Sequence, residues 1–282
     1  MRRGTSTRYA RECTQTFDFK MKPILQKTFT ILGRVLGIKR KKPKTKIGRI
    51  ARRCNNVVSL TALLYLCVLF FPEPLFGHQL EHEGITLHST QFIPPERGKV
   101  LLSQIRSKIR ASEIHDEKQT FQIFLCNSKA LYTFFAPHSR GSFGITNLFS
   151  NIMVANVNLD TNTAAAFRSE NNKRSFVSVA THEIGHEMIK DEFGLISAHK
   201  APKWLNEGYC EYISGESSFP KEKGLEMMSK GESVEDYSFK YFEYRRMVEF
   251  CLEKRGSTIK ELFSDPPSER DIKEKTQQWL SR

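Results

Sequence analysis

The sequence predicts an α+β fold, in which a small mixed sheet and a central helix are followed by a mainly helical C-terminal part and preceded by an apolar N-terminal segment. Three observations lead to this prediction. Short segments rich in β-branched and aromatic residues lie within residues 85–160, apolar residues recur at helical spacing from residue 176 onward, and residues 57–71 form an uncharged apolar run. Strand-like and helix-like segments that are largely separated along the chain are typical of α+β domains.

The basic residues are concentrated at the N-terminus. Residues 1–53 contain 17 Lys and Arg against Glu12 and Asp18, a formal net charge of +15, whereas the whole chain carries +13, which leaves −2 for the rest. A nucleic-acid-binding protein carries its basic patch on the folded domain, so we expect no nucleic-acid partner. Residues 1–55 are predicted to form a basic cytoplasmic tail. Met21 is an alternative start, and residues 22–36 are either disordered or an amphipathic helix on an anionic membrane.

An apolar segment at residues 56–72 follows this tail. Its uncharged core, residues 57–71, has fifteen residues and ends in a helix-stopping Pro-Glu-Pro sequence. Most transmembrane helices have ~20 apolar residues, and the cores of signal peptides have ~7–15. An uncleaved signal anchor and a signal peptide cleaved near residue 77 are therefore both open, and we favour the anchor. Basic residues before the segment predict a cytoplasmic N-terminus and an extracytoplasmic domain, which would be secreted if the signal is cleaved.

Residues 73–84 are expected to form a linker to a single domain of residues 85–282. Period-two patterns predict strands at residues 85–88, 121–126 and 151–160, and apolar spacing predicts helices at residues 95–111 and 130–136. Further helices are expected from residue 176, at residues 204–213 and 239–254, and in two short pieces on either side of Pro266-Pro267. The polar residues 215–238 between them form either a lid or a simple connector.

The helix that begins at residue 176 carries the motif His182-Glu183-Ile184-Gly185-His186. Residues four apart lie on one face of a helix, so both imidazoles can bind one zinc ion at ~2.0–2.1 Å. Glu183 then lies beside the metal, where a general base takes a proton from an activated water. The motif predicts a zinc-dependent hydrolase in which His182 and His186 are metal ligands and Glu183 is catalytic.

Catalytic zinc sites use a third protein ligand and keep one position open. Glu207 is the best candidate, because it lies in the second helical segment within the sequence Trp-Leu-Asn-Glu-Gly. Glu211 lies one turn further along the same face. One of these carboxylates would bind the metal while the other orients a ligand histidine from outside the coordination sphere.

Residues 176–212 resemble the gluzincin metallopeptidases, in particular the small peptidase MA-like domains with a HExxH helix and a W-L-x-E-G segment. The resemblance implies a zincin-like fold, Glu207 as the third zinc ligand and Glu211 as the acid that orients the first histidine. Residues 241–256 resemble a later helix of the family, in which Tyr241 takes the place of a tyrosine that stabilises the oxyanion. Tyr244 stands where the family has a serine, so the choice between the two tyrosines stays open.

Two further expectations come from the family. In gluzincins a strand like residues 151–160 is the sheet edge beside the active-site helix, and peptides lie along it, although an ordinary sheet strand fits the sequence equally well. The family also places the helices of Cys210 and Cys251 near each other, which allows one disulfide, and reduced buried thiols are the alternative.

The function predicted from the sequence is therefore that of a membrane-associated or secreted zinc metallopeptidase that acts on a peptide or protein substrate. Two alternatives belong to other classes: a catalytically inactive, zinc-stabilised peptide-binding domain, and a membrane-tethered scaffold that acts through its basic tail. The cofactor expected is Zn²⁺, and residues 57–71 are expected to contact the membrane. The sequence does not indicate an oligomeric state.

Overall fold

The computed structural model describes residues 45–147, 149–232 and 234–281, without the side chains of residues 169–171. The chain divides between Phe71 and Pro72 into two compact units, which are considered separately. Most of the predicted basic tail, the alternative start at Met21 and the amphipathic helix considered for residues 22–36 lie outside the described residues.

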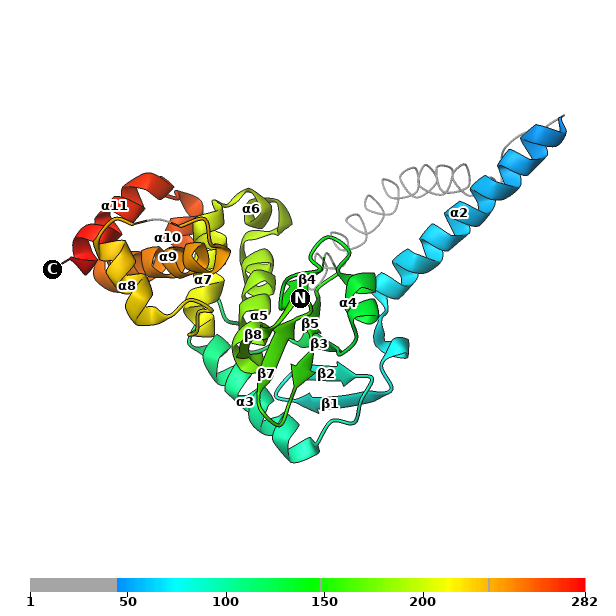
Figure 1. The fold of residues 1–282 in the computed structure, drawn as a ribbon, viewed down its shortest axis with the longest axis horizontal. Helices are drawn as coiled ribbons and strands as arrows, with labels where there is room; N and C mark the ends of the chain where they lie inside the picture. The colour runs from blue at the N-terminus through cyan, green and yellow to red at the C-terminus, as the bar shows by residue number, and fades with distance from the viewer. Residues whose placement is uncertain (1–44, 148, 233, 282) are drawn as a thin grey trace, which may run out of the picture. The chain divides into compact units, whose positions relative to one another are not determined.

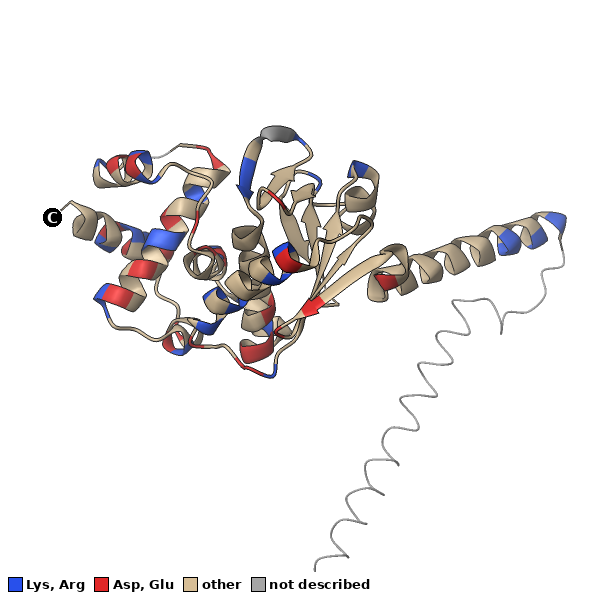
Figure 2. Cartoon of the chain, turned by 90° about the horizontal axis from the view of Figure 1, so that it is seen from below, with Lys and Arg blue, Asp and Glu red and all other residues tan. Residues whose placement is uncertain are grey.

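The first unit contains one long helix, α2 (Lys46–Phe70), whose N-terminus is capped by the side chain of Thr45. It is the one helix among the described residues that is long and apolar enough to cross a membrane. Lys and Arg gather in its first two turns and the remainder is uncharged (Figure 2). Its 25 residues are more than the predicted apolar run because the basic residues before that run are also helical. Its uncharged part, residues 54–70, has 17 residues and is ~26 Å long at ~1.5 Å per residue, slightly less than the ~30 Å core of a bilayer.

The second unit is an α+β domain built on a five-stranded mixed sheet with the strand order β1-β2-β3-β5-β4 (Figure 1). The three inner strands are parallel and the two edge strands are antiparallel to their neighbours. The strands are β1 (His78–His82), β2 (Ile85–Ser89), β3 (Phe121–Cys126), β4 (Gly144–Thr146) and β5 (Asn151–Ala155). The predicted α+β class and the mixed sheet are therefore confirmed.

The linker predicted at residues 73–84 is mostly ordered structure. After the short 3-10 helix η1 (Glu73–Leu75), β1 pairs with β2 through a tight turn at Glu83 and Gly84. Both turn residues have positive φ, 50° and 74°, as a two-residue hairpin of this kind requires. The sequence did not clearly predict β1 or its hairpin with β2, because β1 is a polar edge strand whose side chains are largely exposed.

The strand predicted at residues 151–160 is shorter than expected and is not a sheet edge. β5 ends at Ala155 because Asn156 has a φ of 43°, which interrupts the extended backbone. The following residues belong to a second, three-stranded antiparallel sheet of β6 (Val157–Asn158), β7 (Thr163–Ala166) and β8 (Ser169–Ser175). β4 covers the exposed side of β5 and is itself the edge strand.

Helices cover both faces of the main sheet. α3 (Pro95–Arg110) and α5 (Phe176–Phe193) pack on one face, and α4 (Lys129–Phe135) lies on the other (Figure 1). The core between the sheet and α5 is formed by alternate residues of the inner strands, such as Ile123 and Leu125, together with Val179, Ile184 and other apolar residues. Thr181 and Ser178, although polar, are also fully buried in α5.

The C-terminal part is helical, as predicted. It contains α6 (Leu195–Lys200), α7 (Lys203–Ser214), α8 (Lys221–Ser229), α9 (Tyr237–Glu249), a π-helical turn η2 (Phe250–Lys254), α10 (Ile259–Ser264) and α11 (Glu269–Leu280). The segment 215–238, considered as a lid or a connector, includes α8, whose Met227 and Met228 pack on Phe239 and Phe242 in a second apolar cluster.

Glycines allow the site-bearing helices to approach closely. A Cβ atom on Gly185 of α5 would lie 2.9 Å from Cys210 Sγ, and one on Gly208 of α7 would lie 2.5 Å from the carbonyl oxygen of Tyr244. Real Cβ atoms do not make such contacts, so both positions require glycine. The five described cysteines are all free thiols, and Cys210 forms no disulfide with Cys251.

Candidate metal centre

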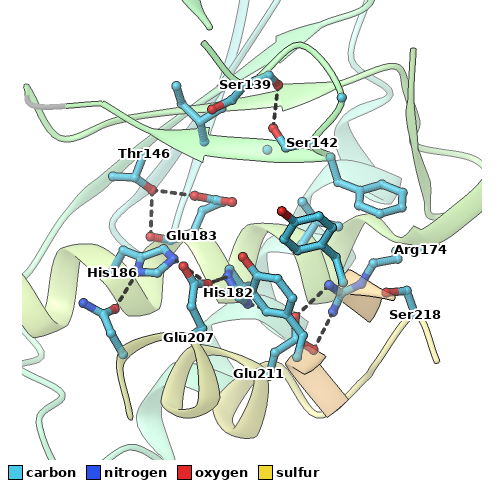
Figure 3. A pocket seen from close by; sticks show the side chains of 18 of the residues that line it. Ser139, Ser142, Thr146, Arg174, His182, Glu183, His186, Glu207, Glu211 and Ser218 are labelled. Atoms are coloured by element: carbon cyan, nitrogen blue, oxygen red, sulfur yellow. Dashed lines mark hydrogen bonds and ion pairs between the residues drawn. The ribbon is translucent and has the colours of Figure 1, made fainter. Parts of the chain in front are cut away.

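The first part of the candidate site is the N-terminal half of α5. Ser175 caps this helix by accepting a hydrogen bond from the backbone N–H of Ser178. The helix is apolar at nearly every position that faces the sheet, which turns His182, Glu183 and His186 toward a cleft (Figure 3). The rings of the two histidines have their centroids 5.0 Å apart. The spacing predicted from the sequence thus places both imidazoles on one side of the helix.

The second part is α7, which carries both predicted carboxylates. Glu207 Oε2 lies 3.3 Å from His182 Nε2 and 3.6 Å from His186 Nε2. With ligand bonds of ~2.0–2.1 Å, neighbouring atoms in a tetrahedral zinc site are ~3.3–3.4 Å apart. The carboxylate oxygen therefore lies at, or slightly beyond, the separation from each imidazole nitrogen that a single bound zinc ion requires. The donor set of two imidazoles and one carboxylate suits that metal.

Glu211 takes a different position from Glu207. Its Oε1 atom lies 3.1 Å from His182 Nδ1, on the side of the ring that faces away from Glu207. Arg174 of β8 donates to both oxygens of Glu211, at 2.8 and 3.2 Å. A carboxylate held in this way can fix the orientation of a histidine whose other nitrogen binds a metal. The sequence predicted that Glu211 belongs to the site. It did not predict this for Arg174, because Arg174 lies in no recognisable motif.

His186 is oriented from behind by Asn206, whose Oδ1 lies 2.9 Å from His186 Nδ1. The Asn206 amide donates in turn to the carbonyl oxygen of Ala198, at 2.9 Å, which fixes which atom faces the histidine. Asn206 immediately precedes Glu207 in the Trp-Leu-Asn-Glu-Gly sequence. Its position next to a predicted metal ligand could have identified it as a residue of the site.

Cys210 also lies near both histidines, and atoms of His182, His186 and Cys210 fall within 4.8 Å of one another. Its Sγ atom is 3.4 Å from His186 Nδ1, the nitrogen that also faces Asn206. Burial raises the pKa of this thiol well above its usual range in the metal-free site. Glu207 Oε2 faces Nε2 of both histidines, whereas Cys210 approaches Nδ1 of His186, so the position of Glu207 fits that of the predicted third ligand better.

The charges at the site suit a cation. Burial lowers the pKa of His182, but its contacts with Glu207 and Glu211 outweigh burial and raise that pKa to about 10. Burial raises the pKa of Glu211, but His182 and Arg174 outweigh it and lower that pKa to about 2. In the metal-free site a protonated imidazole therefore lies between two carboxylates, where a metal ion would take over the role of the positive charge.

Glu183 points to the opposite wall of the cleft, which is the edge strand β4 (Figure 3). The hydroxyl of Thr146 lies 2.9 Å from both the carboxylate Oε2 and the backbone carbonyl oxygen of Glu183. Gly144 leaves room for this carboxylate, since a Cβ atom there would be 3.0 Å from Glu183 Cγ. Glu183 is thus held beside the histidines without contacting Glu207.

The two candidate tyrosines of α9 lie in different environments. Tyr241 lines the cleft, and its ring centroid is 6.3 Å from that of His182. Lys203 Nζ lies 5.5 Å from the centre of the Tyr241 ring. Tyr244 is 6% exposed, does not line the cleft and is hydrogen-bonded to Glu269. Burial raises the pKa of Tyr241, so its hydroxyl keeps its proton and can act as a donor.

All of the predicted site residues line one cleft with a volume of about 990 Å³. They are His182, Glu183, His186, Glu207, Glu211 and Tyr241. β4 and the loop before it form one wall, α5 forms the floor, and α7 with the start of α9 forms the other wall. The cleft is large enough for several residues of an extended peptide.

A scan against protein-family models gives no match to this chain, and a search of curated proteins gives no significant match. The resemblance of the two motifs to gluzincins therefore stays a prediction.

Proposed function

We propose that the chain is a zinc-dependent metallopeptidase with a gluzincin-like site in a zincin-like fold. His182, His186 and Glu207 would hold the metal, and Glu183 would be the general base. The observation that carries this proposal is the separation of Glu207 Oε2 from the two histidine Nε2 atoms, 3.3 and 3.6 Å, on a cleft that also contains a carboxylate next to the first histidine.

The chemistry follows from the positions of the side chains. A zinc ion bound there supplies a Lewis acid that polarises a carbonyl group and acidifies water. Glu183, held by Thr146, accepts a proton from the attacking water and passes it to the leaving amine. Tyr241 donates its hydroxyl proton in a hydrogen bond to the oxyanion that forms on the substrate carbonyl, on the side of the cleft opposite β4.

The edge strand β4 suits a polypeptide substrate. It pairs with β5 on one side only, and its residues Gly144, Ile145 and Thr146 line the cleft. An extended peptide can add to such an edge as a further strand, so that backbone hydrogen bonds give affinity and alternate side chains give selectivity. This role, expected for residues 151–160, passes to β4, because β5 is an inner strand.

The chain is further proposed to be a single-pass membrane protein with a cytoplasmic N-terminus and an extracytoplasmic catalytic domain. The three arginines of α2, Arg49, Arg52 and Arg53, all precede its uncharged part, which is the arrangement that retains the N-terminal side in the cytoplasm. The helix α2 is long and apolar enough to cross a membrane, which is compatible with an uncleaved anchor. Cleavage after the helix would release the domain as a secreted enzyme.

The proposal is tested on the full chain in detergent, with His186→Ala and Glu183→Gln as variants. Elemental analysis should find about one zinc per wild-type chain, its loss in His186→Ala and its retention in Glu183→Gln. A peptide library should be cleaved by the wild type and by neither variant. A folded wild type without zinc would refute the metal site.

The same samples separate the alternatives. Zinc with peptide binding but no cleavage would identify an inactive peptide-binding domain. A scaffold that acts through its basic tail would lose its function on deletion of residues 1–53 and keep it in Glu183→Gln. Cleavage that is lost in Glu183→Gln contradicts both.

A further inference from the structure

A second cavity, with a volume of about 530 Å³, lies between α9 and the segment that joins α7 to α8. Its charged lining consists of three cations and two carboxylates. These are Lys221, Arg245, Arg246, Glu216 and Glu249. The lining therefore has a formal charge of +1, whereas the charged residues around the candidate metal centre are mostly acidic.

The two arginines differ in how their charge is neutralised. Arg246 forms an ion pair with Glu249 and lies over the rings of Phe242 and Trp279. The side chain of Arg245 forms no hydrogen bond or ion pair with any of the described residues, and its Nε atom is buried without a partner. A buried guanidinium N–H without an acceptor is unfavourable. The cavity thus contains a cation whose Nε–H group has no acceptor among the described residues, although the carboxylate of Glu249 in the same lining attracts its charge.

This cavity adjoins the catalytic cleft. Ser218 lines both, and the backbone carbonyl of Glu216 accepts a hydrogen bond from Arg174 at the end of the cleft. Along α9, Arg245 follows Tyr241 by one turn, so the two residues lie on the same face of the helix and are ~6 Å apart along its axis. An extended peptide advances ~3.3 Å per residue, so this separation corresponds to about two residues of substrate.

We propose that the second cavity binds a carboxylate of the polypeptide substrate, donated by an Asp or Glu side chain two or three residues from the scissile bond. Arg245 supplies the principal contact, and Lys221 adds positive charge at the mouth. A carboxylate fits better than a phosphate group, because Glu216 and Glu249 leave only one net positive charge in the lining. The choice of substrate rests on the proposed peptidase function, whereas the carboxylate site itself does not.

The first experiment tests the carboxylate site without any catalysis. The full chain in detergent is treated with phenylglyoxal, which modifies arginine, and adducts are quantified by mass spectrometry with N-acetylaspartate, N-acetylasparagine or inorganic phosphate present. Both acetylated amino acids are used as their α-amides, so that the side-chain carboxylate of the aspartate is the only carboxylate that distinguishes them. The N-acetylaspartate α-amide at saturation should slow modification of Arg245 about tenfold, because a bound carboxylate shields the guanidinium. The N-acetylasparagine α-amide should have no effect, and the exposed Arg270, which lines neither cavity, should react equally in all samples. Equal reaction of Arg245 in every sample, or stronger protection by phosphate, would overturn the assignment.

The second experiment tests the substrate preference. Matched peptides with Asp or Asn at each position near the scissile bond are cleaved by the wild type, Arg245→Met, Arg245→Lys and the control Arg270→Met. Loss of one charge-assisted hydrogen bond should change the ratio of kcat/KM values for the Asp and Asn peptides by about tenfold. We expect this ratio to approach one in Arg245→Met, to be partly kept in Arg245→Lys and to be unchanged in Arg270→Met. An unchanged ratio in Arg245→Met would refute the preference, whereas a wild type that cleaves no peptide would refute the peptidase and leave the protection result to decide the carboxylate site.

Discussion

Arg174 holds Glu211 through both of its carboxylate oxygens, at 2.8 and 3.2 Å, and Glu211 in turn lies 3.1 Å from the rear nitrogen of His182 (Figure 3). The arginine also donates to the hydroxyl of Ser178, at 3.2 Å, one turn before His182 on the same helix. Two consecutive elements, β8 and α5, are therefore joined to the later helix α7 directly behind His182, the first of the proposed metal ligands.

Replacement of Arg174 by lysine should lower zinc affinity about tenfold, and replacement by methionine should lower it further, because an ammonium group cannot hold both oxygens of Glu211 and methionine holds neither. The affinity is measured by competition with a chelator. Lys173→Met, at an exposed neighbour on the same strand, serves as the control. Equal affinity in all three variants would show that Glu211 orients His182 without help from Arg174.

Removal of the hydroxyl of Thr146 should affect catalysis and leave zinc in place. Thr146→Val keeps the shape of the side chain but removes the hydrogen bonds to Glu183, so the proposed general base loses its fixed orientation. We expect kcat to fall about tenfold with unchanged zinc content. Thr146→Ser retains the hydroxyl and should keep most of the activity, and a fall of equal size in both variants would contradict a role for the hydrogen bond.

Substitution at Gly208 should destabilise the domain. A methyl group there would lie 2.5 Å from the backbone carbonyl oxygen of Tyr244, which cannot move without shifting α9. We expect Gly208→Ala to lower the free energy of unfolding by about 2 kcal/mol, because overpacking outweighs the better helix propensity of alanine. Urea denaturation measures the effect. Gly77→Ala, where no atom lies within 4 Å, should change stability little.

Zinc uptake should release a proton from His182. Its contacts with Glu207 and Glu211 raise the pKa to about 10, so the ring is protonated below that pH and neutral above it. Zinc binds the neutral ring, and apparent affinity should therefore rise with pH until about pH 10. Calorimetry in buffers of different ionisation enthalpy at about pH 8 should detect about one proton per zinc. A histidine with the ordinary pKa of ~6.5 would release almost none.

The arrangement of the proposed ligand side chains was predictable in part because their signal is local. His182 and His186 are one turn apart, and Glu207 and Glu211 are one turn apart, so the helical repeat alone places each pair on one face. The helix α7 has one apolar face, whereas α5 is buried on nearly every side. What the helical repeat leaves open is how the helices meet. Gly185 lies at the contact of α5 with α7, and Gly208 lies at the contact of α7 with α9.

The opposite wall of the cleft was not predictable in the same way. β4 has three residues within a loop rich in glycine and serine, which is too short to show a period of two. Arg174 lies in a polar strand and acts only through a contact with a residue 37 positions later. Such features depend on tertiary packing, which no local pattern encodes. The prediction that residues 151–160 form one strand at the sheet edge was wrong for a related reason. Apolar and polar residues continue to alternate in the sequence past Asn156, although the strand ends before it.

The buried free cysteines can report on local opening of the domain. Cys126, Cys210 and Cys251 are buried free thiols, and a thiol reagent reaches them only when the domain opens. Cys210 contacts the ring of His186, so its rate of labelling follows the opening of the metal centre, while Cys126 in β3 follows the opening of the sheet. A ligand that protects only Cys210 from the reagent closes the cleft, whereas a ligand that protects Cys210 and Cys126 stabilises the whole domain. The two effects are distinguished without an engineered cysteine.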